Sequence, residues 1–357
     1  MERAGVRLLV HASGLTVVGV VEVADRLPHI LQAFCRVAKT LKQEPPDLVV
    51  LIDFPDFNLR VARLAARRKI PVVYYISPQV WAWRRGRVRR IARDVKRMLV
   101  VFPFERDLYE RHAIPVTYVG HPLMDHPALQ KPVEDRAKTL RSLGLSPLYP
   151  VLGLFPGSRN REVRSLLPDL LGAVRDLRER FPRMQVVLGE ARELEPAMYD
   201  RILGDGPVPV ARVRTGIASV THVCDLALVA SGTATLEVAL FGVPMIVVYR
   251  VSRSTYHLGK WLIRVPAIGL ANLVAQKGVV PELIQGEVCR ERLVDHCLRF
   301  LTDSVYLAAV RKELARTREL LGEPGASERA AGIILEQMTA GRAGGQDTIS
   351  TGPERSA

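Results

Sequence analysis

The residues best suited to chemistry lie in loops that directly follow short apolar runs. One such loop, FPGSR, carries Gly157, Ser158 and Arg159 and precedes a helical pattern that starts near Glu162. Free N–H groups at a helix start, together with a guanidinium group, can bind an anion. Loops at the carboxyl ends of parallel strands are also where ligands bind in open α/β sheets. FPGSR is therefore a candidate anion site.

A second loop, ASGTATLE, stands in the same position after another apolar run. Ser231 and Gly232 end that run, and a helix is predicted to begin near Thr233. Small residues allow the backbone to approach a phosphate or sugar closely, and Glu237 could accept hydrogen bonds from vicinal hydroxyls. The alternative is an ordinary strand-to-helix turn capped by Ser231 or Thr233. Each loop alone fits both interpretations about equally, but together on one sheet edge they favour a nucleotide diphosphate.

The first half of the chain offers a carboxylate that could act as a base. IDFPDFN follows an apolar run and places Asp53 and Asp56 at its carboxyl end. A carboxylate in that place can accept the proton of an alcohol, although capping of the next helix is the favoured role for Asp56. His121 could contact a substrate or serve as a structural histidine. A further loop with Asn272 and Lys277 carries little information alone.

A basic, tryptophan-containing segment concentrates the charge of the chain. From Arg84 to Arg97 there are eight basic side chains and one acid, in a chain with a formal charge of +14. Tryptophan beside arginine suits an anionic surface, which could be nucleic acid, lipid headgroups or a phosphorylated substrate. Val88, Ile91 and Val95 stand at helical spacing, which predicts a helix packed on a sheet with its arginines outward. No known nucleic-acid-binding fold surrounds the segment, so nucleic acid is the less favoured partner.

Two series of alternating strand and helix patterns organise the 357 residues. Such alternation is typical of α/β domains with parallel, doubly wound sheets. A proline-rich stretch separates the two series. We predict a first domain over residues 1–122, a crossing over 123–150, a second domain with C-terminal helices over 151–340, and a disordered polar tail over 341–357.

Several classes of protein are not favoured by the sequence. No apolar run approaches the length of a transmembrane helix, and no secretory signal is expected at the N-terminus. The four cysteines lack metal-like spacing and are expected to be buried free thiols. Motifs of metalloproteases, P-loop proteins, dinucleotide-binding enzymes and serine hydrolases are missing. We therefore expect no metal and no cofactor.

The segment 19–37 predicts a helix with a broad apolar face. Packing of this helix on the sheet explains part of the face. The remainder predicts contact with acyl chains or a bilayer. The residues assigned to this contact are Val20, Val21, Val23, Leu27, Ile30 and Leu31.

Taken in order, these blocks resemble lipid-A-disaccharide synthase, a bacterial family of inverting glycosyltransferases. The matching blocks include IDFPDFN, YYISPQVWAWRRGRV, FPFE, VGHPLMD, LFPGSRNREV, ASGTATLEVALFGVPMIVVYRVS and NLVAQKGVVPELIQ, and the match runs from about Gly5 to Leu335. The resemblance implies two Rossmann-like domains that face a cleft, the GT-B type of glycosyltransferase.

The resemblance also implies a reaction and roles for particular residues. The family joins UDP-2,3-diacylglucosamine to 2,3-diacylglucosamine 1-phosphate and releases UDP, as a cytoplasmic enzyme peripherally associated with the inner membrane. Asp53 would be the base on the acceptor 6-hydroxyl. The nucleotide and diphosphate would be held by Gly157, Ser158, Arg159, Ser231, Gly232, Thr233, Glu237 and Asn272, and Arg84, Arg85 and Arg87 would lie on the acceptor or membrane side. Members can dimerise through C-terminal segments, which leaves a homodimer open.

The start of the chain departs from the family pattern. The family begins with a strand and a glycine-rich GE-(A/S/T)-SGD loop, whereas MERAGVRLL aligns with the segment that follows them. The resemblance therefore implies that the first domain is incomplete at its N-terminus and has an exposed apolar sheet edge. A catalytically inactive fragment of the enzyme is the main alternative function.

Overall fold

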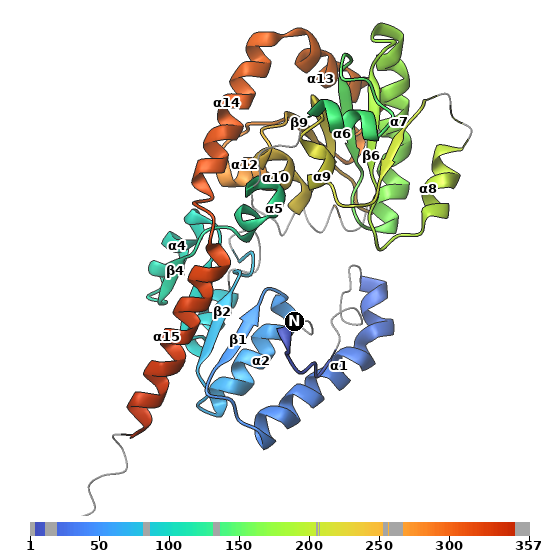
Figure 1. Cartoon of the computed structure of the whole chain (residues 1–357). Coiled ribbons are helices and arrows are strands. Elements are labelled where there is room, and N and C mark those ends of the chain that lie inside the picture. The colour runs from blue at the N-terminus through green and yellow to red at the C-terminus, as the bar shows by residue number, and fades with distance from the viewer. Residues whose placement is uncertain are drawn as a thin grey trace, which may run out of the picture. The chain divides into compact units, whose positions relative to one another are not determined.

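A computed structural model describes residues 4–10, 20–80, 86–130, 136–204, 206, 208–252, 256 and 267–346. The chain divides into two compact units, Met1–Val119 with Ser327–Ala357 as unit 1 and Gly120–Ala326 as unit 2. Each unit contains one parallel sheet with helices against it (Figure 1). The α/β class predicted from the alternating pattern is confirmed.

Unit 1 is built on a sheet of four strands in the order β1-β2-β3-β4, all parallel. The strands are β1 Val49–Ile52, β2 Val72–Tyr75, β3 Arg97–Val100 and β4 Val116–Tyr118. The helices are α1 Val20–Gln43, α2 Pro55–Arg67, α3 Arg87–Asp94, α4 Pro103–Glu110 and α15 Ala326–Gln346. Because each strand connects to the next through a helix, the carboxyl ends of the strands share one edge.

The two faces of this sheet are covered by different helices. Val72 and Tyr74 of β2 pack on one face with Leu59 of α2 and Ile91 of α3. Val73, the residue between them, packs on the other face against α15. Alternate residues of a strand point to opposite faces, so a sheet covered on both sides reads as a continuous apolar run.

Helix α15 returns from the C-terminal part of the chain to unit 1. Its residues Ala330, Ile333 and Ile334 pack against the sheet, and Arg329 Nε donates to the Val119 carbonyl at 2.9 Å. We predicted this helix to belong to the second domain and a disordered tail to begin at residue 341. The helix instead packs on the first sheet and runs to Gln346. Helical spacing shows an apolar stripe but not the surface that the stripe covers.

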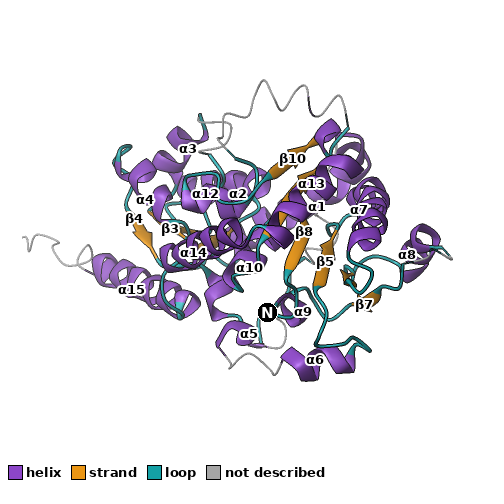
Figure 2. Cartoon of the chain, turned by 90° about the horizontal axis from the view of Figure 1, so that it is seen from above, coloured by secondary structure: helices purple, strands orange, loops and turns teal. Residues whose placement is uncertain are grey.

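Unit 2 contains a parallel sheet of six strands in the order β10-β9-β8-β5-β6-β7 (Figure 2). The strands are β5 Val151–Phe155, β6 Gln185–Gly189, β7 Ala211–Val213, β8 Leu226–Ala230, β9 Met245–Tyr249 and β10 Glu282–Ile284. The helices are η3 Pro122–Asp125, α5 Pro127–Gln130, α6 Arg136–Ser142, α7 Asn160–Arg180, α8 Pro196–Leu203, α9 Ala218–Thr221, α10 Thr233–Leu240, α12 Leu270–Ala275, η4 Gln285–Glu287, α13 Arg290–Thr302 and α14 Ser304–Leu320.

The order of these strands creates a place for a ligand. From β5 the chain builds β6 and β7 on one side, and then returns to place β8, β9 and β10 on the other. The neighbouring strands β5 and β8 are both fully buried. After β5 the chain continues to one side of the sheet, and after β8 it continues to the other side, so the strand order reverses between these two strands. Crevices beyond the carboxyl ends of strands at such a switch point are the usual ligand sites of this architecture.

The cysteines and the helix lengths bear on two further predictions. All four cysteines are free, but Cys35 is exposed and Cys289 is only partly buried, so the expectation of burial holds for Cys224 and Cys297 alone. Within the described residues, no helix has both the length and the apolar character needed to cross a bilayer.

Candidate active site

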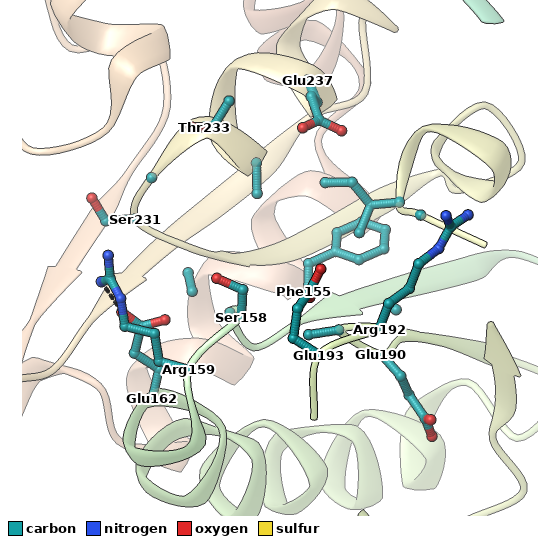
Figure 3. Close-up of a pocket in the computed structure, with 18 residues that line it drawn as sticks. Phe155, Ser158, Arg159, Glu162, Glu190, Arg192, Glu193, Ser231, Thr233 and Glu237 are labelled. Carbon is teal, nitrogen blue, oxygen red and sulfur yellow. Dashed lines mark hydrogen bonds and ion pairs between the residues drawn. The ribbon is translucent and has the colours of Figure 1, made fainter. Parts of the chain in front are cut away.

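A pocket of about 460 Å³ lies at the carboxyl edge of the unit 2 sheet (Figure 3). The loops that follow β5, β6, β7 and β8 all contribute to its lining. Of the eight residues that we predicted to hold a nucleotide, the pocket brings together Gly157, Ser158, Arg159, Ser231, Gly232, Thr233 and Glu237.

The FPGSR loop can approach a ligand closely because of its glycine. Gly157 has φ 107°, and a Cβ atom at this position would lie 2.5 Å from Glu162 Oε2. Arg159 stands directly before α7 and donates to Glu162 Oε1 at 2.6 Å. The side chain of the N-cap residue Arg159 forms no capping hydrogen bond with the first turn of α7. The Arg159 guanidinium and the positive end of the α7 dipole therefore lie at the same side of the pocket, as binding of an anion requires.

The second loop has the same construction at the start of α10. Gly232, with φ 151°, is the N-cap residue, and no side chain caps the first turn. Ser231 instead donates to the Ile268 carbonyl at 2.9 Å, and Thr235 donates to the Gly232 carbonyl at 2.8 Å. The alternative of a turn capped by Ser231 or Thr233 is therefore not what the structure shows.

Glu237 is one of the carboxylates that line this pocket. It is half-buried on α10, and Figure 3 shows its carboxylate directed toward the pocket. Burial raises the pKa of this carboxyl above its ordinary value. Among the described residues no donor forms a hydrogen bond with it, and a buried acceptor without a donor costs free energy. Ligand hydroxyl groups could supply those donors.

The opposite wall of the pocket was not predicted from the sequence. It comprises Glu190–Glu193 after β6 and Gly216–Ile217 after β7. Arg214 donates to the Glu190 carboxylate at 3.3 Å and to the Arg192 carbonyl at 3.0 Å. Arg192 Nε in turn donates to the Arg214 carbonyl at 2.8 Å, which ties the two loops together. This wall, like FPGSR, is a loop at the carboxyl end of a strand, since Glu190–Glu193 follow β6 directly.

Asn272 does not line the pocket, although we predicted that it would. Its Nδ2 donates to the Val280 carbonyl and to Glu282 Oε1, both at 2.8 Å. Its Oδ1 accepts from the backbone N–H groups of Val279 and Val280, at 2.8 and 2.9 Å. Both polar atoms of the buried Asn272 amide thus form hydrogen bonds that stabilise this turn. Lys277 pairs with Glu313 at 2.5 Å.

Asp53 lies in unit 1, at the carboxyl end of β1. Its φ of 44° and the φ of 47° at Phe54 are both left-handed. The Asp53 carbonyl accepts hydrogen bonds from the Tyr74 hydroxyl and from Asn58 Nδ2, each at 2.7 Å. These bonds hold a strained backbone in place, and strain of this kind clusters at functional sites. The side chain is exposed and, among the described residues, forms no ion pair.

The chain neighbours of Asp53 and some residues of α1 have exposed apolar side chains. Ile52 is 41% exposed and Phe54 37% exposed. The Phe54 ring stacks on Phe57 with centroids 5.8 Å apart. On α1, Leu31 is 48% exposed and Ile30 is partly buried. The other predicted contact residues of this helix have side chains outside the described part of the chain: Val20, Val21, Val23 and Leu27.

The prediction that the basic helix has its arginines outward is wrong for Arg87. The exposed Arg89, Arg90 and Arg93 point outward as predicted, but Arg87 is only 8% exposed and pairs with Asp56 in the first turn of α2. Asp56 is not the helix cap that we favoured, since the N-cap residue is Phe54. Arg84, Arg85 and the tryptophans between β2 and α3 lie outside the described residues.

His121 has a structural role. Its Nδ1 accepts from the Leu123 N–H at 3.1 Å and so caps the short helix η3. Burial lowers the pKa of this histidine to about 4. Throughout the part of the chain that is described, no group of His, Cys, Asp and Glu side chains could hold a metal ion.

Comparison with known proteins agrees with the resemblance noted in the sequence. A family model described as lipid-A-disaccharide synthetase matches residues 1–336. The lipid-A-disaccharide synthases of Geobacter sulfurreducens and Geobacter metallireducens are 46% and 47% identical to the chain over 338 residues, which is 95% of this chain and 87% of each relative. That of Coxiella burnetii is 36% identical over 334 residues, 94% of this chain and 87% of the relative.

Solved structures share the fold. A UDP-GlcNAc 2-epimerase from Neisseria meningitidis bound to UDP-GlcNAc matches with a TM-score of 0.59 and 13% identity, over 86% of this chain and 82% of that chain. An α,α-trehalose 6-phosphate synthase from Burkholderia multivorans matches with a TM-score of 0.52 and 14% identity, over 90% and 78%. At such identities the likeness shows only the GT-B type of fold. The chain belongs to the lipid-A-disaccharide synthase family and is a hexosyltransferase of lipid A biosynthesis.

Proposed function

We propose that the chain transfers 2,3-diacylglucosamine from its UDP derivative to the 6-hydroxyl of 2,3-diacylglucosamine 1-phosphate and releases UDP. The observation that carries this proposal is the pocket of unit 2, where two uncapped helix starts and Arg159 surround one space. Two such helix starts suit a diphosphate, because each directs N–H groups and the positive end of a helix dipole at an anion.

The donor is the nucleotide sugar. Its diphosphate lies between the starts of α7 and α10, where Arg159 contacts it. Glu237 accepts hydrogen bonds from a pair of ribose hydroxyls, which gives a half-buried carboxylate the donors that it lacks in the free protein. The uracil ring of the nucleotide lies against the opposite wall, which consists of Glu190–Glu193 and Gly216–Ile217. Hydrogen bonds of Arg192 and Arg214 join the two loops of this wall. The epimerase structure bound to UDP-GlcNAc supports this assignment by the similarity of its fold.

The acceptor side provides Asp53 as the general base. Its carboxylate takes the proton of the 6-hydroxyl as the oxygen attacks C1 of the donor sugar. The C1–O bond to the diphosphate breaks, the new C1–O6 bond forms with inversion, and UDP leaves with the electron pair. Arg159 and the backbone N–H groups stabilise the charge that develops on the leaving group.

The acyl chains of the substrates and the bilayer contact the exposed apolar side chains of unit 1 in this proposal. Ile52, Phe54 and Leu31 are exposed near the segment that carries Asp53 and on α1. Exposed apolar side chains of this kind suit a protein that lies on the membrane. We propose peripheral association with the cytoplasmic face of the inner membrane.

The experiment that tests the function separates chemistry from nucleotide binding. Asp53→Asn should lower kcat by about 10²- to 10⁴-fold, because it removes a general base. It should leave the Kd for UDP unchanged, since Asp53 lies outside the pocket of unit 2. Both are measured on the purified chain, by release of UDP from the two substrates and by calorimetry. A chain that binds UDP but never transfers sugar would establish the inactive alternative.

A further inference from the structure

A second cavity, of about 510 Å³, lies in unit 1 between α2 and α3. Five arginines contribute to its lining. Arg60 and Arg63 stand three residues apart on α2, and Arg87, Arg90 and Arg93 follow the same spacing on α3. Residues at this spacing share one face of a helix, so two arginine-bearing faces meet at this cavity, which we call the arginine pocket.

The charge of the arginine pocket is not balanced by its own acids. Its two carboxylates are already in ion pairs, Asp56 with Arg87 and Asp94 with Arg93. Within the described chain, Arg60, Arg63 and Arg90 have no carboxylate partner. Three guanidinium groups thus share a small space without a counter-charge, and their repulsion falls when an anion enters.

The backbone adds to this positive field. Pro55 and Gly86, at the starts of α2 and α3, both line the arginine pocket. The Arg87–Asp56 ion pair joins the first turns of the two helices. Helix α3 has no acidic residue in its first turn and no side-chain cap. The positive end of the α3 dipole therefore adds to the charge of the arginine pocket, whereas the first turn of α2 carries Asp56, which is paired with Arg87.

We propose that the arginine pocket binds a phosphate monoester and that this group is the 1-phosphate of the acceptor. Arginine presents forked donors that match tetrahedral phosphate oxygens. A monoester carries close to two negative charges at neutral pH, which suits an excess of positive charge better than a diester with one. The arginine pocket begins at Pro55, two residues after Asp53, so one segment supplies both the base and the phosphate site. The assignment to the acceptor rests on the proposed function.

Direct binding tests the phosphate chemistry without any need for activity. Calorimetry on the full chain uses glucosamine 1-phosphate, with glucosamine as the probe that lacks phosphate and inorganic phosphate as competitor. The double variant Arg60→Gln/Arg90→Gln should weaken glucosamine 1-phosphate by at least about tenfold, the loss expected when charged hydrogen bonds are removed. The matched control is Arg67→Gln/Arg89→Gln, which removes the same charge from the same helices outside the arginine pocket.

The control should bind within about twofold of the wild type, since distant surface charge is screened by salt. An equal loss in both double variants, or no binding of glucosamine 1-phosphate by the wild type, would overturn the proposal. Thermal unfolding checks that the variants fold. Arg60 and Arg90 are exposed, so the melting temperature should stay the same or rise as repulsion is removed.

Steady-state kinetics test the assignment to the acceptor. Arg60→Gln/Arg90→Gln should raise KM for 2,3-diacylglucosamine 1-phosphate about tenfold and leave KM for the UDP-sugar unchanged. The acceptor role would be refuted if the double variant had an unchanged acceptor KM but bound phosphatidic acid vesicles more weakly than the wild type does, with equal binding of both proteins to neutral phosphatidylcholine vesicles. That result would assign the arginine pocket to membrane phosphate. If glucosamine 1-phosphate binds as expected but no sugar is transferred, the proposed function fails while the phosphate site stands.

Discussion

At the scale of single residues, burial moves the pKa of an acid and of a base in opposite directions. It raises the pKa of Glu237 and lowers that of His121 to about 4. Both shifts have one cause, since burial disfavours the charged form of either group. The neutral form of His121 is the one that accepts from Leu123. The charged form of Glu237, by contrast, is the one that a ligand with hydroxyl groups would need.

Glu237→Gln should therefore separate stability from binding. The unliganded variant should unfold at the same or a higher temperature, because a carboxylate disfavoured by burial is replaced by a neutral amide of the same shape. UDP should bind about 2 kcal/mol more weakly, some thirtyfold, as charged hydrogen bonds to the ribose are lost. Calorimetry and thermal unfolding measure the two effects. Glu195→Gln, on an exposed residue outside the pocket, is the control and should change neither.

His121 should make the stability of unit 2 depend on pH. The unfolded chain binds a proton at this residue below about pH 6.5, whereas the folded protein does so only near pH 4. Stability is thus fully present above pH 6.5 and is lost as the pH falls toward 4, by about 3 kcal/mol in all. His121→Asn keeps an acceptor for the Leu123 N–H and removes the titration. Denaturant unfolding of both proteins at pH 7 and pH 4.5 should show a smaller loss in the variant; an equal loss would refute this role.

At the scale of elements, strongly apolar runs predicted the sheet well. The apolar runs that lead into FPGSR and ASGTATLE, which are VLGLF and LALVA, form β5 and β8, and both strands are fully buried. The short β10, whose outer residues are only partly buried, gave too weak a pattern to be recognised as a strand. FPGSR and ASGTATLE were recognised because each has a glycine two residues after the end of a fully buried strand. The position of the wall at Glu190–Glu193 also follows from the rule that ligands bind at the carboxyl ends of strands, since it comes directly after β6. Its side-chain contacts could not be predicted, because the Arg214 bonds that position it join two separate loops.

Helix α1 shows what pattern alone leaves open. One side of it packs inward through Ala33, Val37 and Leu41, whereas Leu31 is exposed. If this outer side touches the bilayer, Leu31→Glu should reduce co-sedimentation with vesicles of bacterial lipids several-fold, because a charge replaces an inserted apolar side chain. The fold should be unaffected. Leu148→Glu, at a more exposed leucine of unit 2, is the control. Equal sedimentation of the wild type and Leu31→Glu would count against membrane contact through this helix.

At the scale of the whole molecule, the chain builds two separate cores and passes between them twice. It leaves unit 1 after Val119 and returns to it at Ser327. The C-terminal helix α15 is therefore part of unit 1, because it covers the sheet face that α2 and α3 leave open. Unit 2 has its own extensive core around β5, β8 and α7. Damage to α15 should therefore affect the two units unequally.

Ala330→Asp tests this division. Ala330 is 2% exposed against Val73 and Leu99, so the variant buries an unpaired carboxylate and should destabilise unit 1 by about 3 kcal/mol or more. Sugar transfer should fall with it, since Asp53 belongs to that unit, while the Kd for UDP in unit 2 should stay within about twofold. Ala331→Asp makes the same change one residue further on, at an exposed position, and should leave both unchanged. Loss of UDP binding in Ala330→Asp alone would mean that the nucleotide site depends on unit 1, because the core of unit 2 would then not suffice to hold it.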